Sequence, residues 1–235
     1  MQPWPWLPLR RYYRRMRALI FDLDGTLVDT VYAHVFAWQL TLAEAGIPID
    51  GWRIHRRIGM SGGLFTRALA REIGRPLTAE QTGFLQDRHG EIFRTLLPAR
   101  RPLPGAVALL GRLREQRVPH GIATSGRRPD IDASLAALEI PAEVPIVTRL
   151  DVTHAKPAPD LFLACQARLG VSAEECYVVG DAVWDLLAAR RARMLSLGLL
   201  TGGYGQDELL AAGAYQVYRD AGELDAALEE LGVIG

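Results

Sequence analysis

The most constraining feature of the sequence is a regular alternation of short apolar runs and longer amphipathic segments. Five runs have the length and apolar character of buried strands: Ala18–Phe21, Pro119–Ala123, Val144–Val147, Tyr177–Val179 and Leu195–Leu200. Between them lie segments with the apolar spacing of helices, for example Val107–Leu113, Leu135–Leu138 and Leu161–Leu169. Strands that alternate with helices of this size predict right-handed βαβ units. The expected fold class is therefore α/β, with a doubly wound, Rossmann-like parallel sheet covered by helices on both faces.

One long stretch, from about Val31 to Arg100, interrupts this alternation. It contains helical patterns but no clear strand, and the patterns cover Val35–Ala45, Leu64–Ile73 and Ala79–Leu97. About seventy helical residues are too many for one crossover between neighbouring strands, which usually needs a dozen or more. We therefore expect an inserted all-helical cap domain over residues 31–100. The catalytic core is then discontinuous, with residues 16–30 before the cap and 101–235 after it.

Residues 1–15 are expected to form an N-terminal extension of this core. A secretory signal would place positive charge before an apolar stretch, whereas here arginines follow an aromatic segment broken by prolines. Met16 immediately precedes the first predicted strand, which suggests an extension of a chain that could start there. A contact with a membrane surface or a partner is the alternative.

The charge balance and the cysteine count exclude several classes of protein. The 27 basic and 27 acidic side chains cancel, which argues against general nucleic-acid binding. No apolar run approaches the roughly 20 residues of a membrane span, so we expect a soluble protein without one. Two cysteines, Cys165 and Cys176, are too few for a disulfide framework and favour a reducing compartment such as the cytoplasm. The pattern favours no particular oligomeric state.

Polar residues follow each of the first four predicted strands, closely after three of them and after a further segment in the case of the third. In order along the chain they are Asp22-Leu23-Asp24-Gly25-Thr26, Thr124-Ser125-Gly126, Lys156-Pro157, and Gly180-Asp181 with Asp185 close behind. In open parallel sheets, ligands bind beyond the carboxyl ends of the strands, so these residues are candidates for one site. Asp and Gly are also ordinary turn residues, and any single motif would be weak evidence. Lys156 is the only lysine, which indicates a place where a compact ammonium is required and a guanidinium would not fit.

The residue types at these strand ends predict phosphoryl transfer. Carboxylates that converge on one place repel each other and need a cation, and oxygen ligands of this kind suit Mg²⁺. A hydroxyl, backbone amides and a lysine beside them provide what a tetrahedral dianion needs. Together with a carboxylate nucleophile, they indicate a reaction that passes through an aspartyl-phosphate.

These motifs resemble those of a known family. DLDGT at Asp22–Thr26, ATSG at Ala123–Gly126, Lys156 before Pro157, and GDAVWD at Gly180–Asp185 are similar to the four motifs of the haloacid dehalogenase-like hydrolase superfamily. The helical insert resembles its helical-cap subclass, which includes phosphoglycolate phosphatases and β-phosphoglucomutases. The likeness covers nearly everything from Arg17 onward.

The resemblance implies a role for each charged residue. Asp22 would attack phosphorus and also bind Mg²⁺, and Asp24 would be the general acid and base, with its backbone carbonyl facing the metal. Lys156 would neutralise charge between Asp22 and the transferring group. Asp181 would be a metal ligand, and Asp185 a ligand or an anchor for the ligands.

The resemblance also implies a phosphate-binding set. Thr124 and the amides of Ser125 and Gly126 would hold the phosphoryl oxygens, with Ser125 as the alternative hydroxyl. Gly25 is expected to allow a close turn. We place Gly25 and Thr26 in the same set of substrate-binding residues.

The cap is expected to supply contacts to the leaving group. His34 and Trp38 stand where related proteins often carry these residue types, and His34 either faces the site entrance or packs within its helix. The Ile58–Gly63 loop resembles the specificity loop of the cap. In β-phosphoglucomutases that loop offers an arginine to a second phosphate, and the matching position here is Gly62. Asp181 stands where those mutases commonly carry glutamate.

We therefore expect a Mg²⁺-dependent phosphatase acting on a small organic phosphate monoester of the sugar phosphate or phosphoglycolate type. A β-phosphoglucomutase-like phosphomutase is one alternative, with Arg56 or Arg57 as a substitute for the absent arginine. A phosphate-switched, receiver-like binding module is another. Receiver domains are about half as long and lack both the Asp24 acid and the cap, so detection of a phosphoaspartate stable for minutes would be needed to favour that reading.

Overall fold

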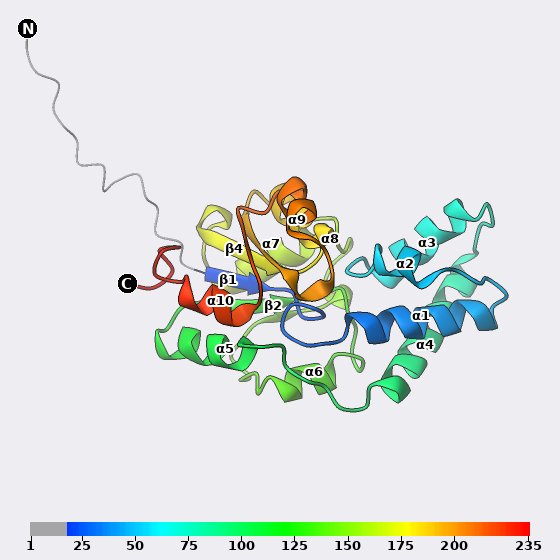
Figure 1. Ribbon diagram of the computed structural model, residues 1–235, viewed down its shortest axis with the longest axis horizontal. Coiled ribbons are helices and arrows are strands. Elements are labelled where there is room, and N and C mark those ends of the chain that lie inside the picture. The colour runs from blue at the N-terminus through cyan, green and yellow to red at the C-terminus, as the bar shows by residue number, and fades with distance from the viewer. Residues whose placement is uncertain (1–17) are drawn as a thin grey trace, which may run out of the picture.

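The computed structural model describes residues 18–235, and the predicted N-terminal extension lies outside the described residues. Its centre is a six-stranded parallel sheet in the order β3-β2-β1-β4-β5-β6 (Figure 1). The strands are β1 (Ala18–Phe21), β2 (His120–Ala123), β3 (Ile146–Val147), β4 (Cys176–Gly180), β5 (Leu195–Leu199) and β6 (Gln216–Tyr218). The predicted α/β class with a doubly wound parallel sheet is confirmed.

Helices cover both faces of the sheet because successive side chains of a strand point to opposite faces. Leu19 and Phe21 of β1 pack in one cluster with α5 (Ala106–Glu115), α6 (Asp132–Ala137) and α10 (Ala221–Ala226). Ala18 and Ile20 pack in a second cluster with α7 (Asp160–Leu169) and α8 (Val183–Arg191). Helix α9 (Gln206–Ala212) packs beside α8. Short 3₁₀ turns complete the core at Arg149–Asp151 (η2), Ala173–Glu175 (η3) and Leu200–Gly202 (η4).

The insert between β1 and α5 is helical, as predicted, and stands apart from the sheet (Figure 1). It consists of α1 (Val31–Glu44), α2 (Gly51–His55), α3 (Gly62–Glu72) and α4 (Ala79–Leu96). These helices bury an apolar cluster of their own, which includes Trp38, Phe65 and Leu85. Helix α4 begins at a capping box in which Thr78 and Gln81 each bond the other's backbone N–H.

Two linkers connect this cap to the core, and they lie antiparallel against each other. Asp29 N donates to Arg101 O at 3.0 Å, and Leu103 N donates to Leu27 O at 2.9 Å. Val28 and Pro102 form an isolated antiparallel bridge between these bonds. The two crossings between core and cap are therefore paired through their backbones.

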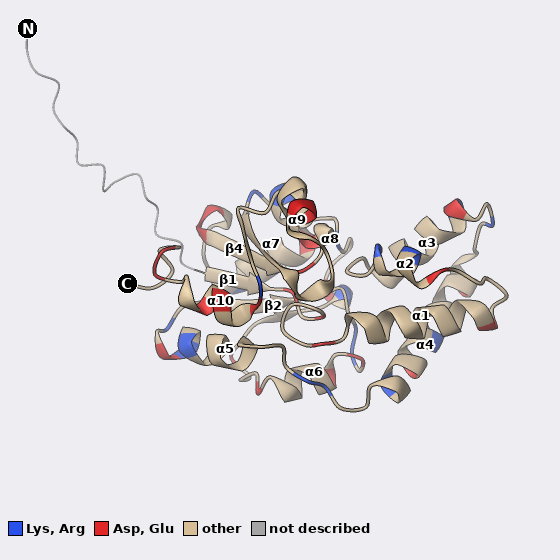
Figure 2. Cartoon of the chain, in the orientation of Figure 1, with Lys and Arg blue, Asp and Glu red and all other residues tan. Residues whose placement is uncertain are grey.

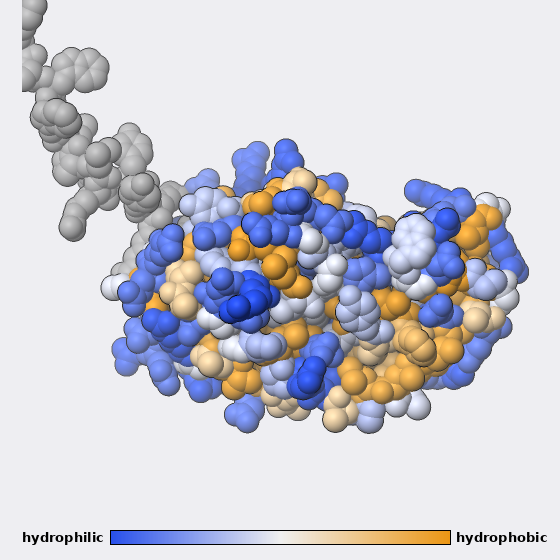
Figure 3. Space-filling view, in the orientation of Figure 1, coloured by the Kyte–Doolittle hydropathy of each residue, from blue (hydrophilic) through white to orange (hydrophobic). Residues whose placement is uncertain are grey.

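The surface is mixed in charge and partly apolar over the cap. Figure 2 shows basic and acidic residues interspersed over both the core and the cap. Figure 3 shows hydrophobic side chains gathered over α1 and α4, where Phe36, Leu40 and Leu96 are exposed. None of the described helices combines the length and the apolar character required to cross a membrane.

Candidate active site

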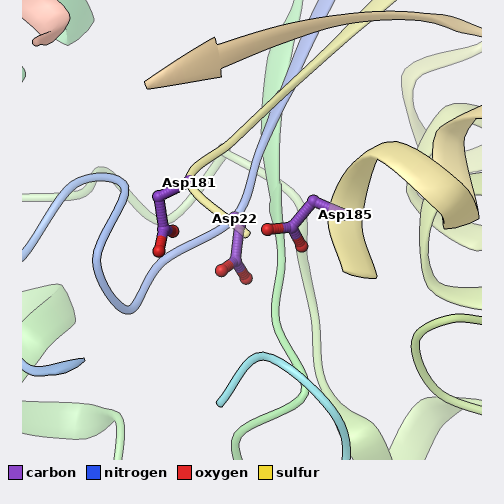
Figure 4. A group of neighbouring side chains, drawn as sticks. All are labelled: Asp22, Asp181 and Asp185. Carbon is purple, nitrogen blue, oxygen red and sulfur yellow. The ribbon is translucent and has the colours of Figure 1, made fainter. Parts of the chain in front are cut away.

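Three buried carboxylates meet at the carboxyl end of the sheet. Asp22 follows β1, Asp181 follows β4, and Asp185 lies in the first turn of α8. Because β1 and β4 are neighbours with Phe21 opposite Val179, the two strands end at the same level. One oxygen from each of the three side chains lies within 4.8 Å of the others, and Figure 4 shows the carboxylates turned toward a common space. The structure thus brings together three of the four predicted metal ligands through their side chains.

Lys156 is the cation of this cluster and has no exposed surface. Its Nζ donates to Asp22 Oδ1 and lies 2.9 Å from Asp185 Oδ1. Burial disfavours the ammonium, but the attraction of Asp185 and Asp22 outweighs it and raises the pKa of Lys156. The lysine therefore stays charged, and one positive charge faces three carboxylates.

The remaining negative charge fits a divalent cation. The contact between Lys156 and Asp185 lacks hydrogen-bond geometry, so the buried Asp185 Oδ1 has no hydrogen-bond donor among the described residues. Burial raises the pKa of Asp22 to about 7, and burial with the charges of Asp185 and Asp22 raises that of Asp181 well above its usual value. All three ligands offer oxygen atoms, which is the donor type that Mg²⁺ prefers. The residues present fit this ion.

Asp24 lies two residues after Asp22, but its carboxylate contacts side chains at the start of α1. Thr30 Oγ1 donates to Asp24 Oδ1 at 2.7 Å, and His34 Nε2 lies 3.5 Å from the same oxygen. Burial alone would raise the pKa of Asp24, but the contacts with His34 and Thr30 outweigh it and lower this pKa. The pKa values of Asp22 and Asp24 are thus shifted in opposite directions, as is common for paired carboxylates with different roles.

A cavity of about 100 Å³ lies between the core and the cap beside these carboxylates. Asp22, Asp24 and the 124–126 turn line its core side. Its cap side combines apolar and aromatic side chains with four polar ones: Trp38, Ile58, Met60, Phe65 and Phe93, together with His34, Arg57, Gln86 and His89. A small ligand placed there would contact both carboxylates of the first motif and the cap at once.

The model of the haloacid dehalogenase-like hydrolases matches residues 16–193 of this chain. The chain belongs to this family. The resemblance of the four motifs is thereby confirmed, and so is the expectation that the chain is a hydrolase.

Similar members of the haloacid dehalogenase-like hydrolases span almost the whole chain. The chain is 31% identical over 228 residues to a β-phosphoglucomutase of Bacillus subtilis, covering 91% of this chain and 93% of that one. It is 32% identical over 218 residues to a phosphoglycolate phosphatase of Rhodospirillum rubrum, covering 88% and 89%. A solved hydrolase structure from Pseudomonas syringae is 46% identical with a TM-score of 0.88, covering 91% of this chain and 98% of that one.

In this haloacid dehalogenase-like site, the residues of the predicted phosphate-binding set fall into two places. Thr124 is buried in the cavity wall, where its Oγ1 accepts from Gly126 N at 2.9 Å. Ser125 also lines the cavity, and its hydroxyl donates to Gly59 O of the cap at 3.1 Å. The Ser125 proton is thus bonded to the cap, and the choice of Thr124 as the phosphate-binding hydroxyl stays a prediction.

Gly25 and Thr26 lie behind the cavity wall, against Asp181. Thr26 Oγ1 donates to Asp181 Oδ1 at 2.6 Å. Gly25 has a φ of +86°, and a Cβ at this position would overlap Asp181 Oδ2 and Val31. Their observed contacts therefore position the Asp181 carboxylate, and a direct contact with phosphate stays a prediction.

His34 faces the site, and the structure adds a second histidine that the sequence analysis missed. His34 Nδ1 lies 3.2 Å from His89 Nε2 of α4, and the His34 ring stacks on Phe93 at 3.8 Å. Burial and the nearby positive charges lower the pKa of His89 well below its usual value, so His89 is neutral. No motif surrounds His89, and its place in the cavity follows only from the packing of α4 on α1.

Proposed function

We propose that this chain is a Mg²⁺-dependent phosphatase that hydrolyses small organic phosphate monoesters, of the sugar phosphate or phosphoglycolate type, through a phosphoaspartate on Asp22. The observation that carries the proposal is the position of Asp22. Its carboxylate contacts Lys156, belongs to the acidic cluster and lines the cavity. A nucleophile, its counter-charge and the space for a substrate therefore coincide at one side chain.

Two half-reactions follow from this arrangement. Asp22 attacks phosphorus, the ester oxygen leaves, and Asp24 gives that oxygen a proton. Asp24 then takes a proton from water, which attacks the phosphoaspartate, releases inorganic phosphate and restores Asp22. The lowered pKa of Asp24 favours the carboxylate form that the second half-reaction requires. Mg²⁺ held by Asp22, Asp181 and Asp185 would stabilise the negative charge of the transferring phosphoryl group.

The cap favours a phosphatase over a phosphomutase. A Cβ at Gly62 would lie 3.0 Å from Cγ of Gln86, so Gln86 fills the space into which a side chain at position 62 would point. Arg57 is paired with Glu72, and Arg56 is paired with Glu208. Both arginines considered as substitutes thus have a carboxylate partner, and of the two only Arg57 lines the cavity. The Ile58–Gly63 loop itself contains no arginine.

The two cysteines support a cytoplasmic location for this enzyme. Cys165 and Cys176 are both buried free thiols, and the chain has no other cysteine. Proteins of oxidising compartments use their cysteines in disulfides much more often than proteins of reducing ones.

The direct test is phosphate release by the purified protein. With Mg²⁺ present it should hydrolyse p-nitrophenyl phosphate and members of a panel of sugar phosphates and phosphoglycolate, and EDTA should abolish the release. Asp22→Asn should lower kcat by at least about 1000-fold, because the amide cannot act as the nucleophile. Asp50→Asn, at an exposed acid of the cap, is the matched control and should keep the wild-type rate.

Two results would contradict the proposal: turnover that does not depend on metal, or full activity of Asp22→Asn. The mutase alternative is tested by adding β-glucose 1-phosphate with its bisphosphate. Accumulation of glucose 6-phosphate faster than inorganic phosphate would favour the mutase.

A further inference from the structure

His55 joins the cap to the core on the side of the site where Asp181 lies. It is the last residue of α2, and its Nε2 lies 2.8 Å from the carbonyl oxygen of Gly202 in η4. A carbonyl oxygen only accepts, so His55 Nε2 carries the proton and donates it. The ring is stacked on Tyr32 at 5.5 Å with an interplanar angle of 5°, and it is tilted against Tyr204 at 5.6 Å. These two aromatic rings fix the direction in which the N–H group points.

Gly202 is packed directly against the carboxylate of Asp181. A Cβ at Gly202 would overlap Asp181 Oδ2, so the main chain itself forms this wall. Gly25 forms the opposite wall against the same oxygen. Thr201 Oγ1 donates to Gly25 O at 2.5 Å and ties the two walls together. The direction of the Asp181 carboxylate therefore depends on where Gly202 is held.

Further hydrogen bonds and an ion pair hold the C-terminal end of α2 on the core without involving Gly202. The carbonyl oxygen of Arg56 accepts from Trp184 Nε1 at 3.2 Å and from Tyr204 Oη at 3.0 Å. The Arg56 guanidinium is paired with Glu208 of α9. Among the hydrogen bonds of residues 18–235, the bond from His55 is the one that runs from the cap to Gly202. Docking in general and the bond to Gly202 can thus be separated by mutation.

We propose that His55 is a positioning residue whose hydrogen bond to Gly202, rather than docking of the cap in general, raises the metal affinity of the Asp22–Asp181–Asp185 cluster. The bond from His55 holds Gly202 against Asp181, and Gly202 keeps the Asp181 carboxylate turned toward Asp22 and Asp185. The inference rests on the proposed function in that the cluster is taken to bind Mg²⁺. Coupling between two binding events is reciprocal, so Mg²⁺ should in turn stabilise the contact between α2 and the core.

The test is the Mg²⁺ affinity of His55→Phe, measured by isothermal titration calorimetry with MgCl₂. Phenylalanine keeps a ring between Tyr32 and Tyr204 but cannot donate to Gly202. The dissociation constant for Mg²⁺ should rise about 5-fold, as expected for one lost hydrogen bond of ordinary net strength. At saturating Mg²⁺, kcat should stay within about twofold of the wild type.

Two further variants make the comparison specific. Arg56→Ala removes the ion pair with Glu208 and the contact of the guanidinium with the Tyr204 ring, and it should leave the Mg²⁺ affinity unchanged. His55→Gln restores an N–H donor at about the same reach and should recover most of the affinity. In hydrogen–deuterium exchange, Mg²⁺ should slow exchange over residues 51–58 in the wild type and much less in His55→Phe.

A wild-type Mg²⁺ affinity in His55→Phe would overturn the inference. An equal loss in Arg56→Ala would also overturn it, because any loosening of the cap would then suffice. If circular dichroism shows that His55→Phe does not fold, Thr201→Val probes the same wall from the core side and should weaken Mg²⁺ binding. Absence of phosphatase activity in the wild type would contradict the proposed function, while the calorimetric comparison would still decide the coupling.

Discussion

At the scale of single residues, the site concentrates buried charge that a fold tolerates only when it is compensated. Asp22, Asp181, Asp185 and Lys156 are all nearly or fully buried. Removing an ion from water costs several kcal/mol, and a buried ion pair returns this cost only with good geometry and further hydrogen bonds. Here one ammonium faces three carboxylates, and Asp185 Oδ1 has no hydrogen-bond donor within residues 18–235. The stability of the protein without metal should therefore depend on the protonation of these acids.

The first prediction concerns stability as a function of pH. Burial raises the pKa of Asp22 from 3.8 to about 7, so the folded protein keeps a proton that the unfolded chain releases. In EDTA, the proton held by Asp22 should therefore increase the free energy of unfolding. This stabilisation should be fully present below about pH 4 and should be lost as the pH rises to about 7. Urea unfolding at several pH values between 4 and 7 measures it. Saturating Mg²⁺ should oppose the loss, because the ion favours the carboxylate.

Asp22→Asn provides the control for this prediction. An amide does not titrate in this range, so the decline in stability between pH 4 and 7 should be smaller in the variant than in the wild type. Identical pH dependence in the two proteins would show that Asp22 is not the titrating group.

Residues that follow strands were predictable from the sequence, and so was His34, but the cap residues His55 and His89 were not. Asp22 and Asp181 each come directly after a short apolar run, and parallel strands bring such positions to one edge. His55 and His89 lie in helices without a motif, and their partners are 147 and 55 residues away in the sequence. The role of His55 depends on how the cap sits on the core, and that of His89 on how α4 packs on α1, and local patterns specify neither.

At the scale of secondary structure, elements with a clear apolar pattern agree with the sequence analysis, even the two-residue strand β3, whereas β6 and α2, whose patterns are weak, were missed. Strand β6 was missed because it lies at the edge of the sheet, where Gln216 and Val217 are only partly buried, so that its three residues show no clear apolar pattern. Helix α2 was missed because its five residues span little more than one turn. Its stability comes from contacts, with Ile54 buried in the cap cluster, rather than from its own pattern.

A prediction at this scale concerns the start of α4. Thr78→Ala removes the side chain that accepts from Gln81 N at 3.1 Å, and the loss of such a cap typically costs about 1 kcal/mol. Urea unfolding should show this decrease, and kcat should be unchanged because Thr78 does not line the cavity. Thr95→Ala is the matched substitution inside the last turn of the same helix and should change stability by less than about 0.5 kcal/mol. Equal effects of the two substitutions would exclude a capping role.

At the scale of the whole molecule, both thiols report on global unfolding. Cys165 on α7 and Cys176 on β4 are fully buried in the same apolar cluster, which lies between one face of the sheet and the helices α7 and α8. Burial raises the pKa of Cys165 to about 12 and that of Cys176 to about 11, so neither is a reactive thiolate near neutral pH. The chain thus has no accessible thiol in its folded state.

The corresponding prediction is a labelling experiment with Ellman's reagent at pH 8. The native protein should react at the rate of global unfolding, and the urea-denatured protein should react at once with two equivalents, matching its two cysteines. One fast equivalent in the native protein would mean that either α7 or β4 opens locally and exposes its cysteine without global unfolding.

The paired linkers have a consequence for how the cap moves. Because the two crossings between core and cap are bonded to each other, we expect them to bend together, so that a rotation of the cap would take place about a single hinge line. His34 stands in the first turn of α1, next to this line, so rotation displaces it little. The His34 imidazole should therefore stay beside Asp24 during such a rotation, and the parts of the cap farther from the hinge line would be displaced more.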